Sequence, residues 1–332
     1  MQIERLIVES PSPPFPIYAD PIKDFLGAHA TEDSGRDPAS AHILAVLSGY
    51  AYADTATVMM MAGRLGLGGS ACVRVIQAVD AMWIFSTAYF LQSRCGRLGI
   101  LCYRGTEPAN LANWLGDADV GSDTIGLDGA RLSVHSGFYR NMLATRWPVL
   151  ELLHAAARGE SLAGAATPVG HPLEALYIAG HSLGGAMSVL FALSLIGSES
   201  ARYLVDRLRA IYTFGQPLTT GGPLPEVAGV VGRRLFRHIH AHDVVPSLPP
   251  GTWGPLEHYG HEFHFADGQW RRREPVTMQL QNFRDVPRSV LAMFAPVRRR
   301  AEVRLTMADH GPHHYIAALR PAGRVTEFGD PG

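Results

Sequence analysis

A serine between two glycines is the first candidate for chemistry in this chain, in the segment Gly180-His-Ser-Leu-Gly184. The apolar residues 176–179 before it are typical of a strand, and the small and apolar residues 183–196 after it are typical of a helix. A sharp strand-to-helix turn of this kind lifts the serine hydroxyl above the sheet and leaves no room for side chains at the glycines. The pattern predicts Ser182 as a nucleophile at a helix N-terminus, where negative charge is favoured. A plain glycine-rich turn is the alternative; a phosphate-binding loop is disfavoured, because no Lys-Ser/Thr pair ends the segment.

A serine hydroxyl is a weak nucleophile until an imidazole takes its proton and a carboxylate orients that imidazole. In hydrolases with such a turn, the acid and then the base follow the serine along the chain. Asp243 comes just after the strand pattern 235–241, at the carboxyl end of the strand, where ligand-facing loops lie. Asp206 competes, but it lies in a polar, helix-like stretch before a strand. Asp243 is therefore the predicted acid, whereas the chain offers 15 histidines as candidates for the base.

The segment 180–186 resembles the corresponding turn of the fungal-type, or class 3, lipase family. Further blocks resemble landmarks of that family and occur in the same order: Tyr103-Arg-Gly-Thr106, Val134-His-Ser-Gly-Phe138, Tyr212-Thr-Phe-Gly-Gln-Pro217, His242-Asp-Val-Val-Pro246 with Leu248-Pro-Pro250, and Tyr259-Gly-His261. The resemblance covers about residues 80–320, and the first 40 residues carry none.

The resemblance also implies a base. Members of the family often carry it near the C-terminus, in an Asp-His segment that is followed by a tyrosine and a short helix. Asp309-His310 and the run 315–319 match that arrangement, so His310 is the implied base, and Asp243 matches the family's acid. His313 and His314 stay open as alternatives, because position rather than chemistry separates the three histidines.

Two groups are expected to form an oxyanion hole. The backbone N–H of Leu183 supplies one donor, and a loop after an earlier strand supplies the other. The resemblance puts Thr106 in this second place, with its N–H and its hydroxyl. Arg104, close by, is expected to make a structural ion pair rather than to bind a charged substrate.

Residues 107–129 lie where the lipase family carries a mobile helical lid. Leu111, Trp114 and Leu115 fall on one side of a possible short helix there, and would cover the site in water and spread on a lipid surface. An ordinary surface helix is the alternative.

The resemblance implies a serine hydrolase that cleaves carboxylic esters of lipids, a triacylglycerol lipase or carboxylesterase that works through an acyl-enzyme. A phospholipase A-type acyl hydrolase is the alternative of the same chemistry, and a non-catalytic binding module is the alternative of another class. The expected partners are a lipid or ester substrate and, transiently, a lipid interface. No cofactor is expected. No metal is expected either, because the cluster of six histidines lacks both the H-E-x-x-H helix and the cysteine pairs of zinc sites. The cluster comprises His238, His240, His242, His258, His261 and His264.

Strand-like and helix-like runs alternate through the chain. Helical spacing covers residues 41–65, 138–158 and 183–196, strand patterns cover 175–179, 210–214 and 235–241, and two hairpins are expected over 81–103 and 263–270. This alternation favours an α/β-hydrolase fold, with a mostly parallel central sheet and helices on both faces. The expected organisation is an N-terminal arm over residues 1–40 and one domain over residues 41–332.

Composition narrows the class of protein further. The 332 residues carry a net charge of −1, so no long-range field attracts nucleic acid, and the triplets Arg271–Arg273 and Arg298–Arg300 are expected to be solvated surface. The three cysteines have no metal-ligand spacing; Cys95 and Cys102 are expected to be buried thiols, with a single disulfide left open. The N-terminal residues do not resemble a secretory signal, and no apolar run reaches the length of a membrane helix. These features favour a location in the cytoplasm or export by another route.

Overall fold

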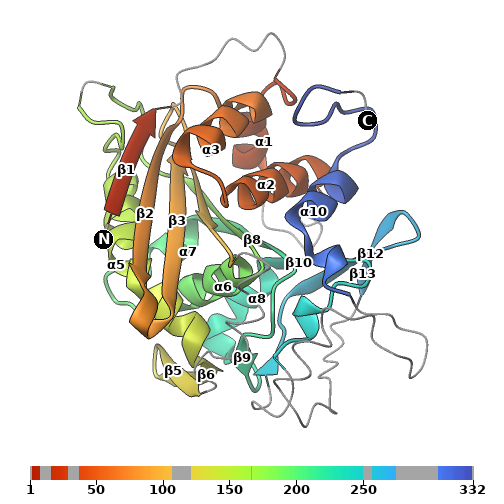
Figure 1. Ribbon diagram of the computed structural model, residues 1–332. Coiled ribbons are helices and arrows are strands. Elements are labelled where there is room, and N and C mark those ends of the chain that lie inside the picture. Colours follow the sequence, from red (N-terminus) through yellow and green to blue (C-terminus); the bar gives the residue numbers. More distant parts are fainter. Residues whose placement is uncertain are drawn as a thin grey trace.

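A nine-stranded sheet forms the centre of the computed structural model, which describes residues 2–7, 16–28, 37–106, 121–165, 167–249, 256–273 and 306–330. Its strand order is β1-β2-β3-β4-β7-β8-β10-β12-β13 (Figure 1). The strands are β1 (Gln2–Ile7), β2 (Ala71–Val79), β3 (Ile84–Gln92), β4 (Leu98–Tyr103), β7 (Ala175–His181), β8 (Leu208–Phe214), β10 (Leu235–His240), β12 (His261–Ala266) and β13 (Gln269–Arg273). The middle of the sheet, from β4 to β12, is parallel, while both flanks are antiparallel.

Helices cover both faces of this sheet (Figure 1). One face packs against α1 (Pro21–Gly27), α2 (Pro38–Tyr50), α3 (Thr55–Ala62) and α10 (Pro312–Leu319), and the other against α5 (Ser136–Ala157) and α6 (Leu183–Ile196). Shorter helical turns are η2 (Gly63–Leu67), η3 (Asp80–Met82), α7 (Leu204–Arg207), η4 (Glu226–Ala228), α8 (Gly229–Arg233), η5 (Val245–Ser247) and η7 (Ala308–His310). The predicted α/β-hydrolase fold is confirmed.

A second, four-stranded sheet lies below the first in Figure 1 and was not predicted. Its order is β11-β9-β6-β5, from β5 (Ser122–Leu127), β6 (Ala130–His135), β9 (Thr220–Gly221) and β11 (Leu256–Glu257). Every pairing in it is antiparallel. The β5–β6 hairpin alternates buried and exposed residues over only six positions per strand, which is a weak signal inside a polar, glycine-rich stretch.

Both predicted hairpins are confirmed, as β3–β4 and β12–β13. The single helix expected over residues 41–65 is wrong, because the chain forms α2 and α3 with a break between them. Asp54 causes the second start, since its side chain accepts a hydrogen bond from the Thr57 backbone N–H at 2.7 Å and caps α3. All three cysteines are free thiols, of which Cys72 and Cys102 are buried and Cys95 is partly exposed.

The first residues of the chain contact the same body. β1 is the edge strand of the large sheet, and Phe25 of α1 is fully buried, with its carbonyl accepting a hydrogen bond from the Tyr177 hydroxyl. The boundary at residue 40 between arm and domain stays a prediction. Among the described residues, no helix is both long and apolar enough to cross a membrane.

Candidate active site

Ser182 lies at the sharp turn between β7 and α6, which we call the elbow. Its backbone has φ 58° and ψ −131°, a conformation that a residue other than glycine adopts only under constraint. A Cβ atom at Gly180 would lie 2.2 Å from the Gly184 carbonyl oxygen, and one at Gly184 would lie 2.2 Å from that of Tyr103. The two glycines are therefore required for the turn, as their spacing around the serine predicted.

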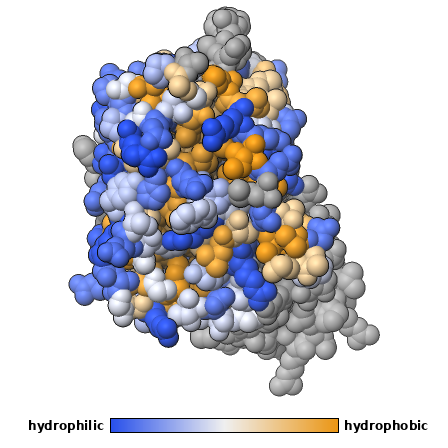
Figure 2. Space-filling model, turned by 90° about the vertical axis from the view of Figure 1, so that its left-hand side faces the viewer, coloured by the Kyte–Doolittle hydropathy of each residue, from blue (hydrophilic) through white to orange (hydrophobic). Residues whose placement is uncertain are grey.

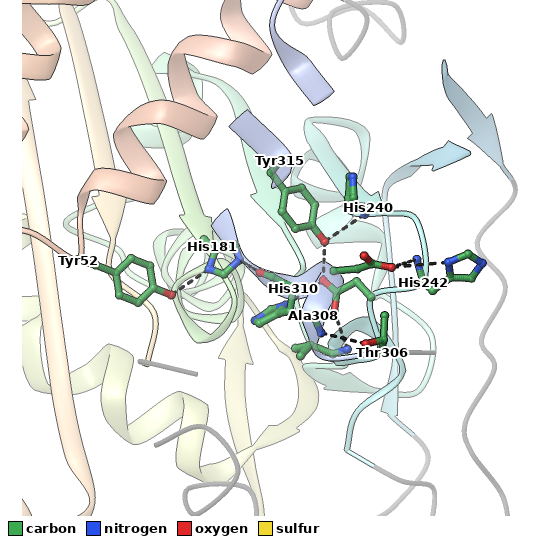
Figure 3. Close-up of polar contacts among 11 residues, drawn as sticks. Tyr52, His181, His240, His242, Thr306, Ala308, His310 and Tyr315 are labelled. Atoms are coloured by element: carbon green, nitrogen blue, oxygen red, sulfur yellow. Dashed lines mark hydrogen bonds and ion pairs between the residues drawn. The ribbon is translucent and has the colours of Figure 1, made fainter. Parts of the chain in front are cut away.

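Asp243 follows β10 and is buried beside His310, which Figure 3 labels together with Tyr315. Its Oδ2 accepts a hydrogen bond from His310 Nδ1 at 2.8 Å and another from the Tyr315 hydroxyl at 2.5 Å. Its Oδ1 accepts from the Val245 backbone N–H at 2.9 Å. Burial opposes ionisation of this carboxyl, but the neighbouring His310 and the three hydrogen bonds outweigh it, so the pKa of Asp243 is lowered. The residue is thus an acceptor that stays ionised.

The segment that carries His310 is tied to the segment that carries Asp243, although 67 residues separate the two in sequence. The Thr306 backbone N–H donates to the His242 carbonyl at 2.7 Å, and the His242 N–H donates to Asp309 Oδ2 at 3.0 Å. Figure 3 shows Thr306 and His242 near each other, on the side of His310 away from Tyr52. These hydrogen bonds hold the backbone of the His310 segment, while the bond to Asp243 holds the imidazole through Nδ1.

The end of β8 also lies against this pair. Gly215 has φ +60°, and a Cβ atom there would lie 2.7 Å from Asp243 Oδ2 and 2.8 Å from His310 Nδ1. Its neighbour Phe214 accepts a hydrogen bond from the Ser182 backbone N–H at 2.9 Å. The strand end therefore links Ser182 to Asp243 and His310.

In contrast to the Asp243 carboxylate, three side-chain atoms of the site make no hydrogen bond within the described residues. Ser182 Oγ, His310 Nε2 and Thr106 Oγ1 are buried, and none has a hydrogen-bond partner within the described part of the chain. Other buried side-chain atoms of the described residues also lack a partner, but these three lie together at the elbow, beside the bonded pair of His310 and Asp243. The first two are the atoms between which a serine proton would move.

The predicted oxyanion residues lie beside the elbow. β4 and β7 are parallel neighbours with Tyr103 opposite Gly180, so the loop after β4 runs past Ser182. A Cβ atom at Gly105 would lie 3.1 Å from the Ser182 Cβ, which puts Thr106 next to the nucleophile. Leu183 is the first residue of α6, a position whose N–H has no partner inside the helix. The guanidinium of Arg104 lies over the Tyr52 ring, 5.7 Å from its centroid.

The competing residues lie elsewhere. His313 is exposed, and the His314 ring stacks on His240 with centroids 5.2 Å apart; neither hydrogen-bonds to Asp243. Asp206 is exposed in α7, before β8 begins, and therefore at the other edge of the sheet. The predicted lid residues Leu111, Trp114 and Leu115 lie outside the described residues.

Three of the clustered histidines bond to backbone carbonyl oxygens. The Nε2 atoms of His258, His261 and His264 bond to the carbonyl oxygens of Pro246, Arg233 and Ala241 at 2.7, 3.2 and 2.8 Å. Within the described ranges, no three His, Cys, Asp or Glu residues are grouped so that they could hold a metal ion.

Sequence reasoning missed the hydroxyl of Tyr315 and the side chains of His181 and Tyr52. Tyr315 entered only as the start of a short helix, and His181 only as the variable residue of the elbow. Tyr52 carried no signal, since it lies 129 residues before the histidine that it contacts.

A parallel sheet with a strained serine after β7, an acid after β10 and a histidine near the C-terminus defines an α/β-hydrolase. The family model described as lipase (class 3) matches residues 100–253, so this part of the chain, which carries the elbow and Asp243, is similar to that family.

Curated relatives that match this chain are named as lipases. Triacylglycerol lipase OBL1 of Ricinus communis is 30% identical over 214 residues, a match that covers 53% of this chain and 40% of that protein. The lipase of Rhizomucor miehei is 33% identical over 110 residues, covering 33% of this chain and 28% of that protein. The chain thus matches less than half the length of these curated relatives. The structure of lipase II from Rhizopus niveus shares the fold, with a TM-score of 0.53 and 20% identity over 83% of this chain and 93% of that one.

Proposed function

We propose that the protein hydrolyses carboxylic esters of lipids, with triacylglycerols as the substrate class. The proposal depends above all on one observation: His310 is bonded to Asp243 through Nδ1, while its buried Nε2 and the buried Ser182 Oγ have no partner among the described residues. The name of the Ricinus communis relative supports acylglycerols as substrates.

In the proposed reaction, Ser182 Oγ attacks the ester carbonyl carbon while its proton passes to His310 Nε2. Asp243 keeps the imidazole in the tautomer with hydrogen on Nδ1 and stabilises the imidazolium. The carbonyl oxygen becomes an oxyanion and accepts hydrogen bonds from Leu183 N–H and from Thr106. Collapse breaks the bond to the alcohol, which leaves with the proton of His310.

The acyl group is then bound as an ester to Ser182. Water attacks this acyl-enzyme and gives its proton to the same His310 Nε2, and a second collapse releases the carboxylic acid and returns the proton to Ser182. Every proton in both halves passes through one nitrogen, so the identity of the base is the most informative point to test.

We expect His310→Ala to abolish turnover of a p-nitrophenyl ester, whereas His314→Ala, the matched control, keeps most of it. The reverse result would assign the base to the neighbouring histidine.

A panel of p-nitrophenyl esters of increasing chain length beside triglyceride and phosphatidylcholine, with Ser182→Ala as the blank, measures substrate class. Dominant activity on phosphatidylcholine would replace the lipase proposal by a phospholipase one. A fluorophosphonate that fails to label the wild type would exclude the serine hydrolase altogether.

We also propose transient contact with a lipid surface near the site. The turn between β2 and β3 exposes Met82 (55%), Trp83 (43%) and Phe85 (41%). β3 starts beyond the end of β4, since Ala88 is the partner of Tyr103, so this turn projects past the carboxyl edge of the parallel strands, where the site lies. Exposed tryptophan and aliphatic side chains favour the boundary between water and lipid.

Exposed apolar side chains occur elsewhere too, as the orange areas on the β1 side of the molecule show (Figure 2). Phe328, 72% exposed, serves as the matched control, because its neighbour Gly329 lies beside Arg64, ahead of β2 and away from the turn. We expect Trp83→Ser to slow hydrolysis of emulsified triglyceride several-fold and to leave a dissolved short-chain ester unaffected. Phe328→Ser should change neither rate. An equal loss in both variants would contradict a lipid contact at the turn.

A further inference from the structure

A chain of hydrogen bonds through two side chains ends on the backbone carbonyl of His310. The Tyr52 hydroxyl lies 2.9 Å from His181 Nδ1, and His181 Nε2 lies 2.7 Å from the backbone carbonyl oxygen of His310. Figure 3 shows the two side chains in line with the base. We propose that His181 and Tyr52 are positioning residues that hold the backbone of the base at the distance its imidazole needs to reach Ser182. This inference rests on the proposed function.

The partners fix the direction of every hydrogen bond in the chain. A carbonyl oxygen only accepts, so His181 Nε2 must carry the hydrogen and donate it to His310. His181 Nδ1 is then the acceptor of the neutral ring, and the Tyr52 hydroxyl donates to it. The tautomer of His181 is thus set from both sides, in the same way that Asp243 sets that of His310.

Burial keeps His181 neutral. The residue is 1% exposed, and burial, with a smaller contribution from the neighbouring His310, lowers the pKa of His181 to about 3. Its ring lies against that of His310, with centroids 4.6 Å apart. A neutral neighbour imposes no charge repulsion when His310 takes the serine proton, so His181 can hold the base without opposing its protonation.

His181 also precedes the nucleophile directly, as the last residue of β7. A Cβ atom at Gly105 would lie 2.2 Å from the Tyr52 hydroxyl oxygen and 2.5 Å from the His181 carbonyl oxygen, so the oxyanion loop packs on the same two residues. The loop after α2, the elbow, the loop after β4 and the segment of the base therefore meet at His181. Any shift of His181 would move nucleophile and base relative to each other.

Without the hydrogen bonds from Tyr52 to His181 and from His181 to His310, the segment of the base keeps its links to Asp243 and to the backbone around His242. The fold near His310 should therefore survive while the position of its ring loosens. Misplacement of a reacting group by about 1 Å can cost about 10²-fold in rate. The expected signature is a loss in kcat at constant KM, since neither residue is assigned to substrate.

The test compares three variants of the full chain on a dissolved p-nitrophenyl ester. His181→Leu removes the donor to His310, and we expect kcat to fall about 10²-fold with KM within twofold of the wild type. His181→Gln, whose amide nitrogen can donate to the same carbonyl, should recover part of the loss. Tyr52→Phe keeps the ring and removes the hydroxyl, and should cost about tenfold, the value of one hydrogen bond.

Tyr50→Phe is the matched control, because the Tyr50 hydroxyl contacts Glu327 at 3.4 Å and not the site. The low-field proton signal of the His310–Asp243 hydrogen bond gives a second readout, which should broaden in His181→Leu and Tyr52→Phe only. Unchanged kcat and an unchanged signal in Tyr52→Phe would overturn the inference, even where His181→Leu fails to fold. Equal losses in Tyr50→Phe would overturn it too. An inactive and unlabelled wild type would instead overturn the proposed function.

Discussion

The two sides of His310 differ in how their polar atoms are satisfied. On the side of Nδ1, Asp243 accepts three hydrogen bonds, and Tyr315 in turn accepts one from the His240 backbone at 3.1 Å. On the side of Nε2, Ser182 Oγ and Thr106 Oγ1 are buried without a partner in the described part of the chain. Satisfied networks stabilise a fold, whereas unsatisfied buried groups destabilise it and persist where a ligand completes them.

This contrast separates stability from activity. Substitutions on the unsatisfied side should remove activity and leave stability equal or higher. Substitutions on the satisfied side should reduce both, because they leave a buried partner unpaired.

Ser182→Ala gives the largest expected effect on activity. Loss of the nucleophile should lower kcat by about 10⁶-fold, the scale found when a member of a serine triad is removed. Removal of a buried hydroxyl that lacks a partner should leave the free energy of unfolding equal or raise it by about 1 kcal/mol. Ester hydrolysis and urea unfolding measure the two quantities, and a clearly less stable variant would contradict the contrast.

Asp243→Asn should lower kcat by about 10⁴-fold, because an amide no longer favours the tautomer with hydrogen on Nδ1. On this side stability should fall as well, by about 1–3 kcal/mol, since the carboxylate is the shared acceptor of three buried donors. Stability equal to the wild type, measured by urea unfolding, would show that the network is not what holds the two segments together.

Thr106→Val keeps the size of the side chain and removes only its hydroxyl. We expect kcat to fall by about 10²-fold, as for the loss of one oxyanion donor, with KM little changed. Stability should again be equal or higher. An unchanged kcat would leave the backbone N–H groups as the whole of the oxyanion hole.

The last expected effect concerns the pH dependence of stability and not the rate of hydrolysis. The pKa of His181 falls from 6.5 to about 3 on folding, chiefly through burial. The unfolded chain therefore binds this proton first as the pH drops below 6.5, and the free energy of unfolding decreases by about 1.4 kcal/mol per pH unit down to about pH 3. The contribution is fully present above pH 6.5.

His181→Leu removes that proton and should give a shallower slope over the same window. His238→Leu, at a ring that packs on Phe263 and Trp270, should reduce the slope similarly, because burial also lowers the pKa of His238 to about 3. It should reduce kcat far less than His181→Leu. Identical slopes in His181→Leu and the wild type would mean that His181 is protonated in the folded protein.

The sequence was informative where chemistry is local. The elbow could be predicted because the spacing of Gly180, Ser182 and Gly184 is required by few other turns. The hairpins could be predicted because turn residues separate two strand-like runs. The position of Asp243 after a strand likewise follows from local pattern. The choice of His310 needed the family resemblance, since nothing in its own segment separates it from His313 and His314.

The support around the triad could not be predicted, because it depends on distance in space. Tyr52 donates to a ring 129 residues later, and Tyr315 to a carboxylate 72 residues earlier. Neither tyrosine differs in its sequence surroundings from one that packs in a core. The antiparallel pairings of β1 with β2 and of β2 with β3 were missed for the same reason, since pairing partners are set by the fold and not by the strand itself.

The glycine at the end of β8 gives the site a mechanical limit. The carboxylate and the imidazole lie so close to residue 215 that one added methyl group occupies the space of their hydrogen bond. Alanine there changes no charge, no donor and no acceptor, yet it would push the acid and the base apart. The proposed chemistry therefore depends at this point on the space left by an absent side chain and on a backbone conformation that favours glycine, so a single added carbon atom should abolish it.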